Sequence, residues 1–346
     1  MSRVIHLLDQ RTPPWMHRQV CRLAGNDERV LLLDTELLGS AQVPVVEVRS
    51  VLPTIQRITT RHAARHLGET ELIHAWGLRA GKRALSIAKD RRVLVSLPGM
   101  DVIGVPDDLP WRIAGMKFDV TLPTAADREA LIAAGGDPRR IHVLPPAGRA
   151  TSESPERIKE LRDHFAPHGQ PLCVVVGELT DHSGGYQASW VHAILSHIQP
   201  NVRILFSRPG PGRKRVETFL HNNGNDDMAS ILDLTIPTAD VLATADVLML
   251  FDQGASNAGD FADALAAAKP ILATDLPGYV DLADTGQAAL LAPTTDIRQA
   301  AGNLLRLLEN TDEICADLSA RAADAAKALA APVVRATLDT IYTPTP

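Results

Sequence analysis

Short apolar runs rich in Val, Ile and Leu alternate along the chain with longer amphipathic segments. Runs such as Val4–Leu8, Val93–Ser96 and Leu172–Val176 have the length of strands and are almost entirely apolar. Continuous apolar strands are typical of parallel sheets with helices on both faces. The pattern therefore predicts an α/β protein made of strand–helix units.

Local signals place several helices between these strands. The segment Ala125–Ala134 begins after Thr124, a good N-cap residue, and ends at a pair of glycines. In the second half we expect helices over Gln187–His197, Gly259–Ala268 and Glu313–Ala331, the last because alanine favours helix strongly. After Ala289–Leu291 the alternation ends, and the chain is expected to be helical.

A polar stretch from Pro145 to Glu156 interrupts the pattern. A chain of 346 residues is too long for one ordinary hydrophobic core, so two domains are expected, 1–150 and 151–346, with the last helix a candidate to pack back on the first domain. Doubly wound sheets bind ligands at the carboxyl ends of their strands. The loops after the strands are therefore where chemistry is expected.

Charge and composition exclude several classes. A net charge of −6 argues against a general nucleic-acid-binding surface. Three widely spaced cysteines indicate a reduced, cytoplasmic protein, and no apolar run is long enough to span a membrane, which leaves peripheral membrane contact open. No spacing of His, Cys or acidic residues indicates a metal site.

The segment Thr238–Leu291 carries the most specific signal. A helix, the buried strand around Val247, a helix ending Asp263-Ala264-Leu265-Ala266-Ala267-Ala268-Lys269-Pro270, another strand and the turn Leu276-Pro277-Gly278 follow in order. This order resembles the donor-binding half of the retaining glycosyltransferases of family 4 (group 1).

Weaker motifs arrive in the order of the same family: His74-Ala75-Trp76-Gly77, Leu97-Pro98-Gly99-Met100-Asp101, Ile141-His142-Val143-Leu144-Pro145, Val175-Val176-Gly177-Glu178-Leu179 with Ser183-Gly184, and Pro209-Gly210-Pro211-Gly212. The resemblance implies the GT-B fold, in which two Rossmann-like doubly wound parallel-sheet domains face each other across a cleft. It also implies a retaining hexosyltransferase that uses a nucleotide-diphosphate sugar as donor substrate, an acceptor of unknown identity, and no cofactor.

The resemblance also implies site residues. The donor would be bound by Gly177, Ser183, Gly184, Ser256, Asn257 and Asp263. His74 and Asp101, which follow strands of the first domain, are candidate catalytic residues. A histidine beside an aromatic can equally be structural, and an Asp in a loop can be a cap or turn residue. Asp263 would be mostly exposed if it were only a helix surface residue.

Several positions depart from the family pattern. Glu178 and Ser183 stand where the family has an Arg and a Lys for the diphosphate, and Ala255 stands where a first carboxylate precedes Asp263 by eight residues. In the first half, Pro98 replaces a histidine, Pro145-Pro146-Ala147 replaces a "PNG" turn, and no glycine-rich loop follows Leu8. These losses support an alternative, an inactive protein of the same fold that binds or scaffolds a partner protein. A weaker third possibility is an epimerase or a phosphorylase-like enzyme.

Cations could reach the site from elsewhere. Arg208, Arg213, Lys214 and Arg215 follow a strand of the second domain and could supply charge, although such a run is also typical of a solvated helix start. The helix after Ser256 could attract an anion with its free N–H groups.

Overall fold

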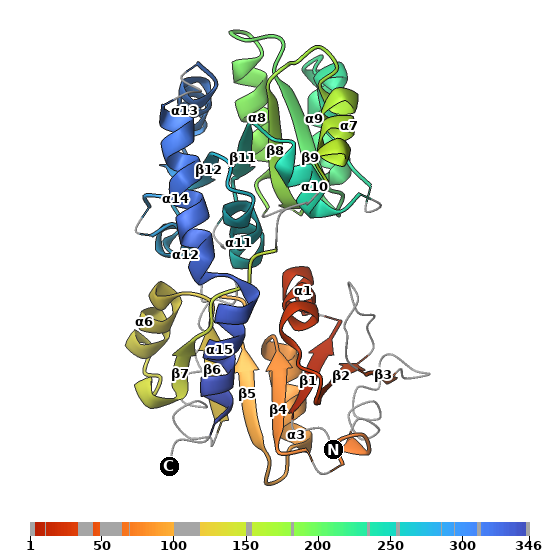
Figure 1. Cartoon of the computed structure of the whole chain (residues 1–346), viewed down its shortest axis with the longest axis vertical. Helices are drawn as coiled ribbons and strands as arrows, with labels where there is room; N and C mark the ends of the chain where they lie inside the picture. Colours follow the sequence, from red (N-terminus) through yellow and green to blue (C-terminus); the bar gives the residue numbers. More distant parts are fainter. Residues whose placement is uncertain are drawn as a thin grey trace. The chain divides into compact units, whose positions relative to one another are not determined.

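The computed structural model describes residues 4–10, 12–33, 44–48, 64–68, 70–99, 118–149, 154–180, 183–233, 236–253, 257–284, 286–293, 295–309 and 313–343. The chain divides into two compact units, Met1–Ala147 with Ala331–Pro346, and Gly148–Ala330. The second unit thus starts close to the boundary expected at residue 150, and the last helix belongs to the first unit (Figure 1).

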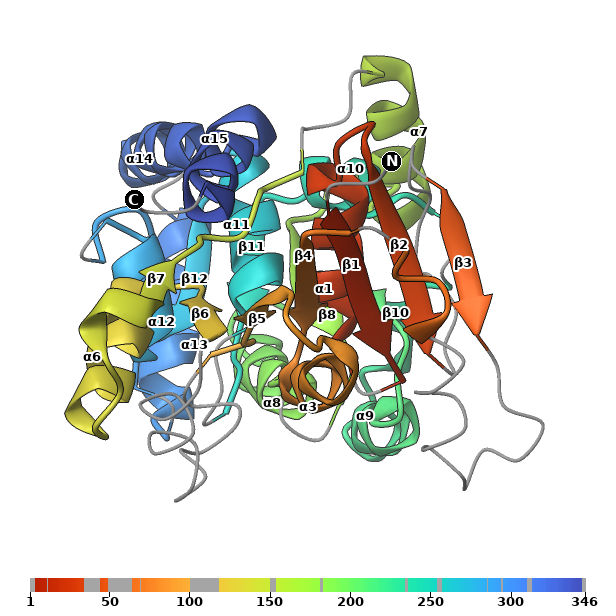
Figure 2. The ribbon, with the colours of Figure 1, turned by 90° about the horizontal axis from the view of Figure 1, so that it is seen from below.

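Unit 1 is built on a parallel seven-stranded sheet with the order β3-β2-β1-β4-β5-β6-β7. Its strands are β1 (Val4–Asp9), β2 (Glu28–Leu33), β3 (Val45–Val48), β4 (Leu72–Trp76), β5 (Arg92–Ser96), β6 (Phe118–Leu122) and β7 (Ile141–Val143). Its helices are α1 (Pro14–Leu23), α3 (Leu78–Ile87), α6 (Ala125–Ala133), the 3-10 turn η1 (Pro138–Arg140) and α15 (Ala331–Tyr342). Figure 2 shows β1, β2 and β3 side by side.

The side chains along each strand of unit 1 point alternately to the two faces of the sheet and form a hydrophobic core on each face. In β1, Ile5 and Leu7 join the cluster that contains the buried face of α3, whereas Val4 and Leu8 join the one that contains α1 and α15. Successive side chains of a strand point to opposite faces, so an apolar strand fills both layers. Thr124 caps α6 as predicted, because its side chain accepts a hydrogen bond from the N–H of Asp127.

Unit 2 carries a parallel six-stranded sheet with the order β10-β9-β8-β11-β12-β13. Its strands are β8 (Leu172–Glu178), β9 (Arg203–Arg208), β10 (Ala229–Ile231), β11 (Val247–Leu250), β12 (Ile271–Thr274) and β13 (Leu290–Ala292). Its helices are α7 (Pro155–Phe165), α8 (Gly185–Leu195), α9 (Arg213–Asn222), the 3-10 turn η2 (Asp226–Met228), α10 (Thr238–Ala243), α11 (Ala258–Ala266), α12 (Pro277–Leu282), α13 (Ile297–Glu309) and α14 (Ile314–Ala328).

Two cores again flank the sheet of unit 2. One holds Val174 of β8 with residues of α10, α11, α12 and α14, and the other holds Cys173 and Val175 with residues of α8, α9 and α13. The predicted two-domain α/β architecture with doubly wound parallel sheets is therefore confirmed. The helix expected over Glu313–Ala331 is α14, which ends at Ala328, and a further helix, α15, begins at Ala331, because Pro332 suits only the first turn of a new helix.

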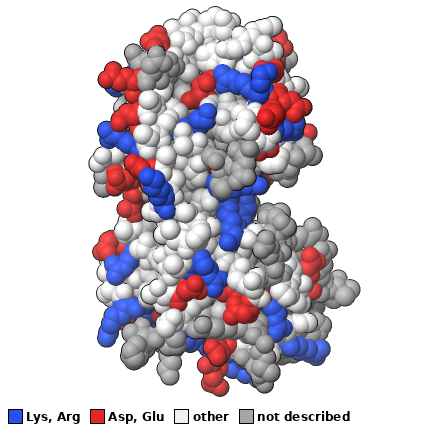
Figure 3. All heavy atoms as spheres, viewed as in Figure 1, with Lys and Arg blue, Asp and Glu red and all other residues white. Residues whose placement is uncertain are grey.

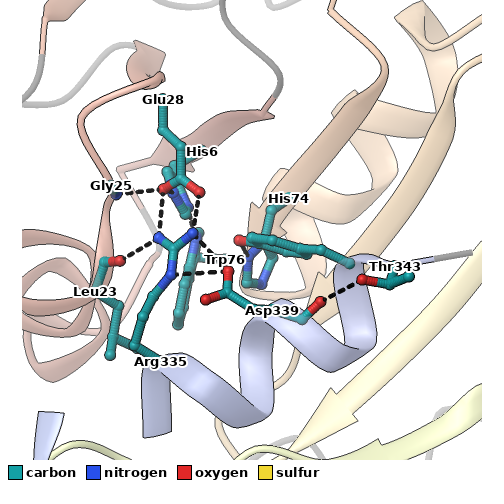
Figure 4. A network of polar contacts seen from close by, with 10 residues as sticks. His6, Leu23, Gly25, Glu28, His74, Trp76, Arg335, Asp339 and Thr343 are labelled. Atoms are coloured by element: carbon teal, nitrogen blue, oxygen red, sulfur yellow. Dashed lines mark hydrogen bonds and ion pairs between the residues drawn. The ribbon is translucent and has the colours of Figure 1, made fainter. Parts of the chain in front are cut away.

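The helix α15 is held to the rest of unit 1 by a buried ionic network (Figure 4). The guanidinium of Arg335 donates to both carboxylate oxygens of Glu28, with Nη2–Oε1 at 2.8 Å and Nη1–Oε2 at 3.0 Å. Arg335 also donates to the carbonyl oxygen of Leu23 at the end of α1. Glu28 is only 2% exposed, so its carboxylate is shielded from water. This network explains why the end of the chain packs on its beginning.

In the same network, the partners of His6 determine which of its ring nitrogens donates a hydrogen bond and which accepts one. The indole Nε1–H of Trp76 can only donate, so Nδ1 of His6, 3.1 Å away, must accept. The proton of His6 therefore lies on Nε2 and is donated to Glu28 at 2.8 Å. Burial alone would raise the pKa of Glu28, but the hydrogen bonds from His6 and Arg335 outweigh it and lower that pKa to about 2. The carboxylate thus stabilises the folded unit above pH about 4.5 and ceases to do so as pH falls toward 2.

We predict that Arg335→Ala lowers the free energy of unfolding by about 3 kcal/mol, because it leaves a buried carboxylate without its cation. Urea denaturation followed by circular dichroism measures the change. The matched control is Arg321→Ala, which breaks an exposed ion pair with Asp317 on α14 and should cost less than about 1 kcal/mol. Equal effects of the two substitutions would contradict the role given to Glu28.

Candidate functional site

The candidate donor site lies where β8, β9 and β11 of unit 2 end. In the sheet order, β9 lies on one side of β8 and β11 on the other, so the chain changes direction across the sheet at β8. Such a switch point is where open α/β sheets bind ligands. Of the described residues predicted to bind the donor, Gly177 lies on β8 and Asp263 on α11. Ser183, Gly184 and Asn257 lie directly before α8 and α11.

Two of the predicted glycines occupy positions where a side chain would not fit. Gly184, the N-cap of α8, has φ +67°, and a Cβ there would lie 1.9 Å from the carbonyl oxygen of Phe251 at the end of β11. Gly177 of β8 has φ +107°, and its Cβ would lie 2.9 Å from Oδ2 of Asp260. Both positions therefore require glycine for the loops to approach this closely.

Three further predicted residues have defined places. Ser183 accepts a hydrogen bond from the N–H of Thr180 at 2.8 Å and so closes the loop after β8. Asn257 is the N-cap of α11 and accepts from the N–H of Asp260. Asp263 of α11 is 3% exposed and accepts from the N–H of Arg149 at 2.9 Å, so it is not an exposed helix residue. Ser256, Ala255 and Asp101 lie outside the described residues.

The first turn of α11 is held from two directions. The hydroxyl of Tyr279 accepts from the N–H of Asn257 at 3.0 Å and donates to the carboxylate of Asp252, the second residue after β11. Burial and the neighbouring Asp252 raise the pKa of Tyr279 well above its ordinary value, so the phenol keeps its proton. The start of α11 is thereby fixed before any ligand arrives.

Sequence reasoning missed Asp260 and gave Arg208 a minor place. Asp260 is 1% exposed; its Oδ1 accepts from Nη1 of Arg208 at 3.1 Å and its Oδ2 from Nδ2 of Asn257 at 2.7 Å. Burial opposes the charge of Arg208, but Asp260, Asp263 and Glu178 together raise its pKa above the ordinary value. The spacing Asn257-x-x-Asp260 at a helix start was the available signal, since it resembles a capping box.

The other cations after β9 remain on the surface. Arg213 pairs with Glu217 at 2.6 Å, Lys214 is exposed, and Arg215 lies over the ring of Tyr186. On the face of the molecule in Figure 3, basic and acidic side chains of the described residues are interspersed in each unit. Arg208 is therefore the cation of this run that reaches the ends of the strands.

His74, the candidate in unit 1, is completely buried. Its Nδ1 lies 2.7 Å from the hydroxyl of Tyr342 and its Nε2 2.7 Å from that of Ser96, and its ring stacks on Trp76 at 4.3 Å. Burial, followed by the neighbouring His6, lowers the pKa of His74 well below its ordinary value of 6.5. These contacts favour the structural role for His74, and its catalytic role stays a prediction.

Unit 1 also contains a small hollow at the carboxyl ends of its strands. The hollow is lined mainly by apolar side chains, among them Trp15, Met16, Trp76, Leu97 and Leu122. Within the described residues, no three His, Cys, Asp or Glu side chains are arranged to hold a metal, and none of the described helices has the length and apolarity of a membrane span.

Comparison with solved structures shows the fold. The crystal structure of Anabaena HepE in complex with UDP and glucose superposes with a TM-score of 0.82 at 16% identity, covering 99% of both chains. The sucrose-phosphate synthase of Thermosynechococcus elongatus gives 0.76 at 13% over 98% of both chains, and a UDP-forming trehalose-phosphate synthase from Burkholderia vietnamiensis gives 0.73 at 13% over 99% of both. The fold is therefore that of the GT-B glycosyltransferases.

The match to a family model covers a shorter part of the chain than the structural matches do. Residues 170–310 match the family model described as glycosyl transferases group 1, which confirms the resemblance predicted from Thr238–Leu291 and extends it over most of unit 2. No curated protein sequence matches the chain.

We predict that His74→Gln lowers the free energy of unfolding by about 2 kcal/mol, because two buried hydrogen bonds and a ring stack are disturbed. It should also flatten the pH dependence of stability. In the wild type the unfolded chain takes up a proton as pH falls through 6.5 while buried His74 does not, so folding stability drops below pH 6.5.

Urea denaturation at several pH values between 5 and 8 measures both effects, with the exposed His66→Gln as control. A normal stability of His74→Gln combined with lost nucleotide affinity or turnover would instead support the catalytic role.

Proposed function

We propose that the chain is a glycosyltransferase that binds a nucleotide-diphosphate sugar in unit 2 and transfers the sugar to an acceptor. One observation carries the proposal: the family match spans every residue predicted to bind the donor, and Gly177, Asn257 and Asp263 lie around one side-chain cluster at the switch point of the sheet. Among the similar structures, that of HepE is a complex with UDP and glucose.

The reaction sets clear demands on this site. The bond between the anomeric carbon and the diphosphate breaks, and the diphosphate leaves with the electron pair. A new bond forms between the same carbon and the oxygen of an acceptor hydroxyl, whose proton passes to the departing diphosphate. Positive charge or N–H donors must therefore meet the diphosphate. Asp263 is assigned to hydroxyls of the donor, and the first turn of α11 supplies oriented N–H groups.

The acceptor is assigned to unit 1. The hollow lined by Trp15, Met16 and Trp76 lies at the carboxyl ends of the strands, where parallel sheets bind ligands.

A second candidate function is a binding or scaffolding protein without turnover. It is favoured by the local charge, since Glu178, Asp260 and Asp263 surround the single guanidinium of Arg208. Three carboxylates so close together repel a diphosphate and weaken its binding.

Calorimetric titration against UDP-, ADP- and GDP-sugars, with an assay for released nucleoside diphosphate, separates the two functions. We expect one donor to bind and to be slowly hydrolysed or transferred. Binding without any turnover would support the scaffolding function, and the absence of binding across the panel would contradict the glycosyltransferase proposal.

Restoring the missing cations gives a further prediction. Glu178→Arg combined with Ser183→Lys should tighten donor binding roughly 10- to 100-fold, since a charged hydrogen bond contributes about 1.5–3 kcal/mol. Glu160→Arg, the same charge reversal on the exposed face of α7, is the control and should leave affinity unchanged. If the double variant binds donor no better than the wild type, the loop after β8 does not meet the diphosphate.

A further inference from the structure

The position of Arg208 suits a role in binding. It is the last residue of β9 and pairs in register with Glu178 at the end of β8. The side chain is only 9% exposed. Its Nη1 contacts Asp260 in the first turn of α11, and its Nε lies 3.3 Å from the hydroxyl of Thr238. The guanidinium therefore lies at the N-terminus of α11, beside the switch point.

The ion pair between Arg208 and Asp260 uses only one oxygen of the carboxylate. An Arg–carboxylate pair is often bidentate, with two parallel hydrogen bonds. Here Oδ2 of Asp260 is used by the side chain of Asn257, at 2.7 Å, and only Oδ1 meets the guanidinium. Among the described residues, nothing accepts a hydrogen bond from the buried Nη2 of Arg208.

An unsatisfied buried guanidinium N–H is costly, because the group has lost its water without gaining an acceptor. A network built only for stability would use it, as Arg335 does in unit 1, where both terminal nitrogens bind Glu28. The guanidinium of Arg208 lies instead beside Asp260 in the first turn of α11, and a helix N-terminus favours an anion. A phosphate oxygen would satisfy both the N–H and the helix.

We propose that Arg208 binds the diphosphate of the donor, an inference that rests on the proposed function. Arg208 would take the place of the Arg and Lys that the family has in the loop after β8. Asp260 is a positioning residue: it holds Nη1 and leaves Nη2 for the ligand. Gly177 belongs to the same arrangement, since any side chain there would contact the carboxylate of Asp260.

The test is calorimetric titration of the full-length chain with UDP, ADP and GDP and with their nucleosides. Arg208→Gln should weaken diphosphate binding roughly ten-fold or more and leave binding of the matching nucleoside unchanged. Asp260→Asn should change affinity in the opposite direction, because it removes a negative charge beside the phosphates. Lys214→Gln, an exposed cation on α9, is the matched control and should change neither affinity.

The opposite signs distinguish binding from structure. If Arg208→Gln and Asp260→Asn both weaken nucleotide and nucleoside alike, or neither changes anything, the pair is structural and the inference is wrong while the proposed function stands. If the wild type binds no nucleoside diphosphate, the proposed function is wrong and the inference with it. If the single variants do not fold, the double variant Arg208→Gln with Asp260→Asn replaces the ion pair with a neutral pair. The double variant should lose the preference for diphosphate over nucleoside. Retention of that preference would overturn the inference.

Discussion

A buried positive charge must find its counter-charges within the fold, and in unit 2 this requirement organises the ends of the strands. Arg208 is brought inside by β9, and Asp260 compensates it from the first turn of α11. That turn is capped by Asn257, which Tyr279 and Asp252 hold in turn. Gly177 lacks a side chain because the carboxylate of Asp260 occupies the space. Four segments distant in sequence thus meet around one guanidinium.

Unit 1 also contains a buried charge, but there every hydrogen-bonding group of the charged pair has a partner. Glu28 is buried, but its two oxygens bind both terminal nitrogens of Arg335, His6 and a backbone N–H. This network is saturated, which is what a purely structural role requires. The network around Arg208 leaves one donor unused. The contrast between the two units supports a structural role for the first and a ligand-binding role for the second.

The sequence predicts the architecture well because it depends on local pattern. Continuous apolar runs fixed β1, β5 and β8, and a threonine before an amphipathic segment identified the start of α6. The helix α15 was missed, since its proline and its β-branched residues have low helix propensity. The contacts of Arg208 were also missed, because they join residues far apart in sequence and nothing at either position alone requires them.

For function, the family pattern indicates where a donor should bind but also shows which charges are missing. The structure brings Arg208 to that same place, so the loss of the loop cations does not leave the site without positive charge. A crystal structure of the chain with UDP tests this account most directly. We expect a phosphate oxygen within hydrogen-bonding distance of Nη2 of Arg208, beside the first turn of α11. A bound nucleotide whose phosphates lie away from Arg208 would contradict it.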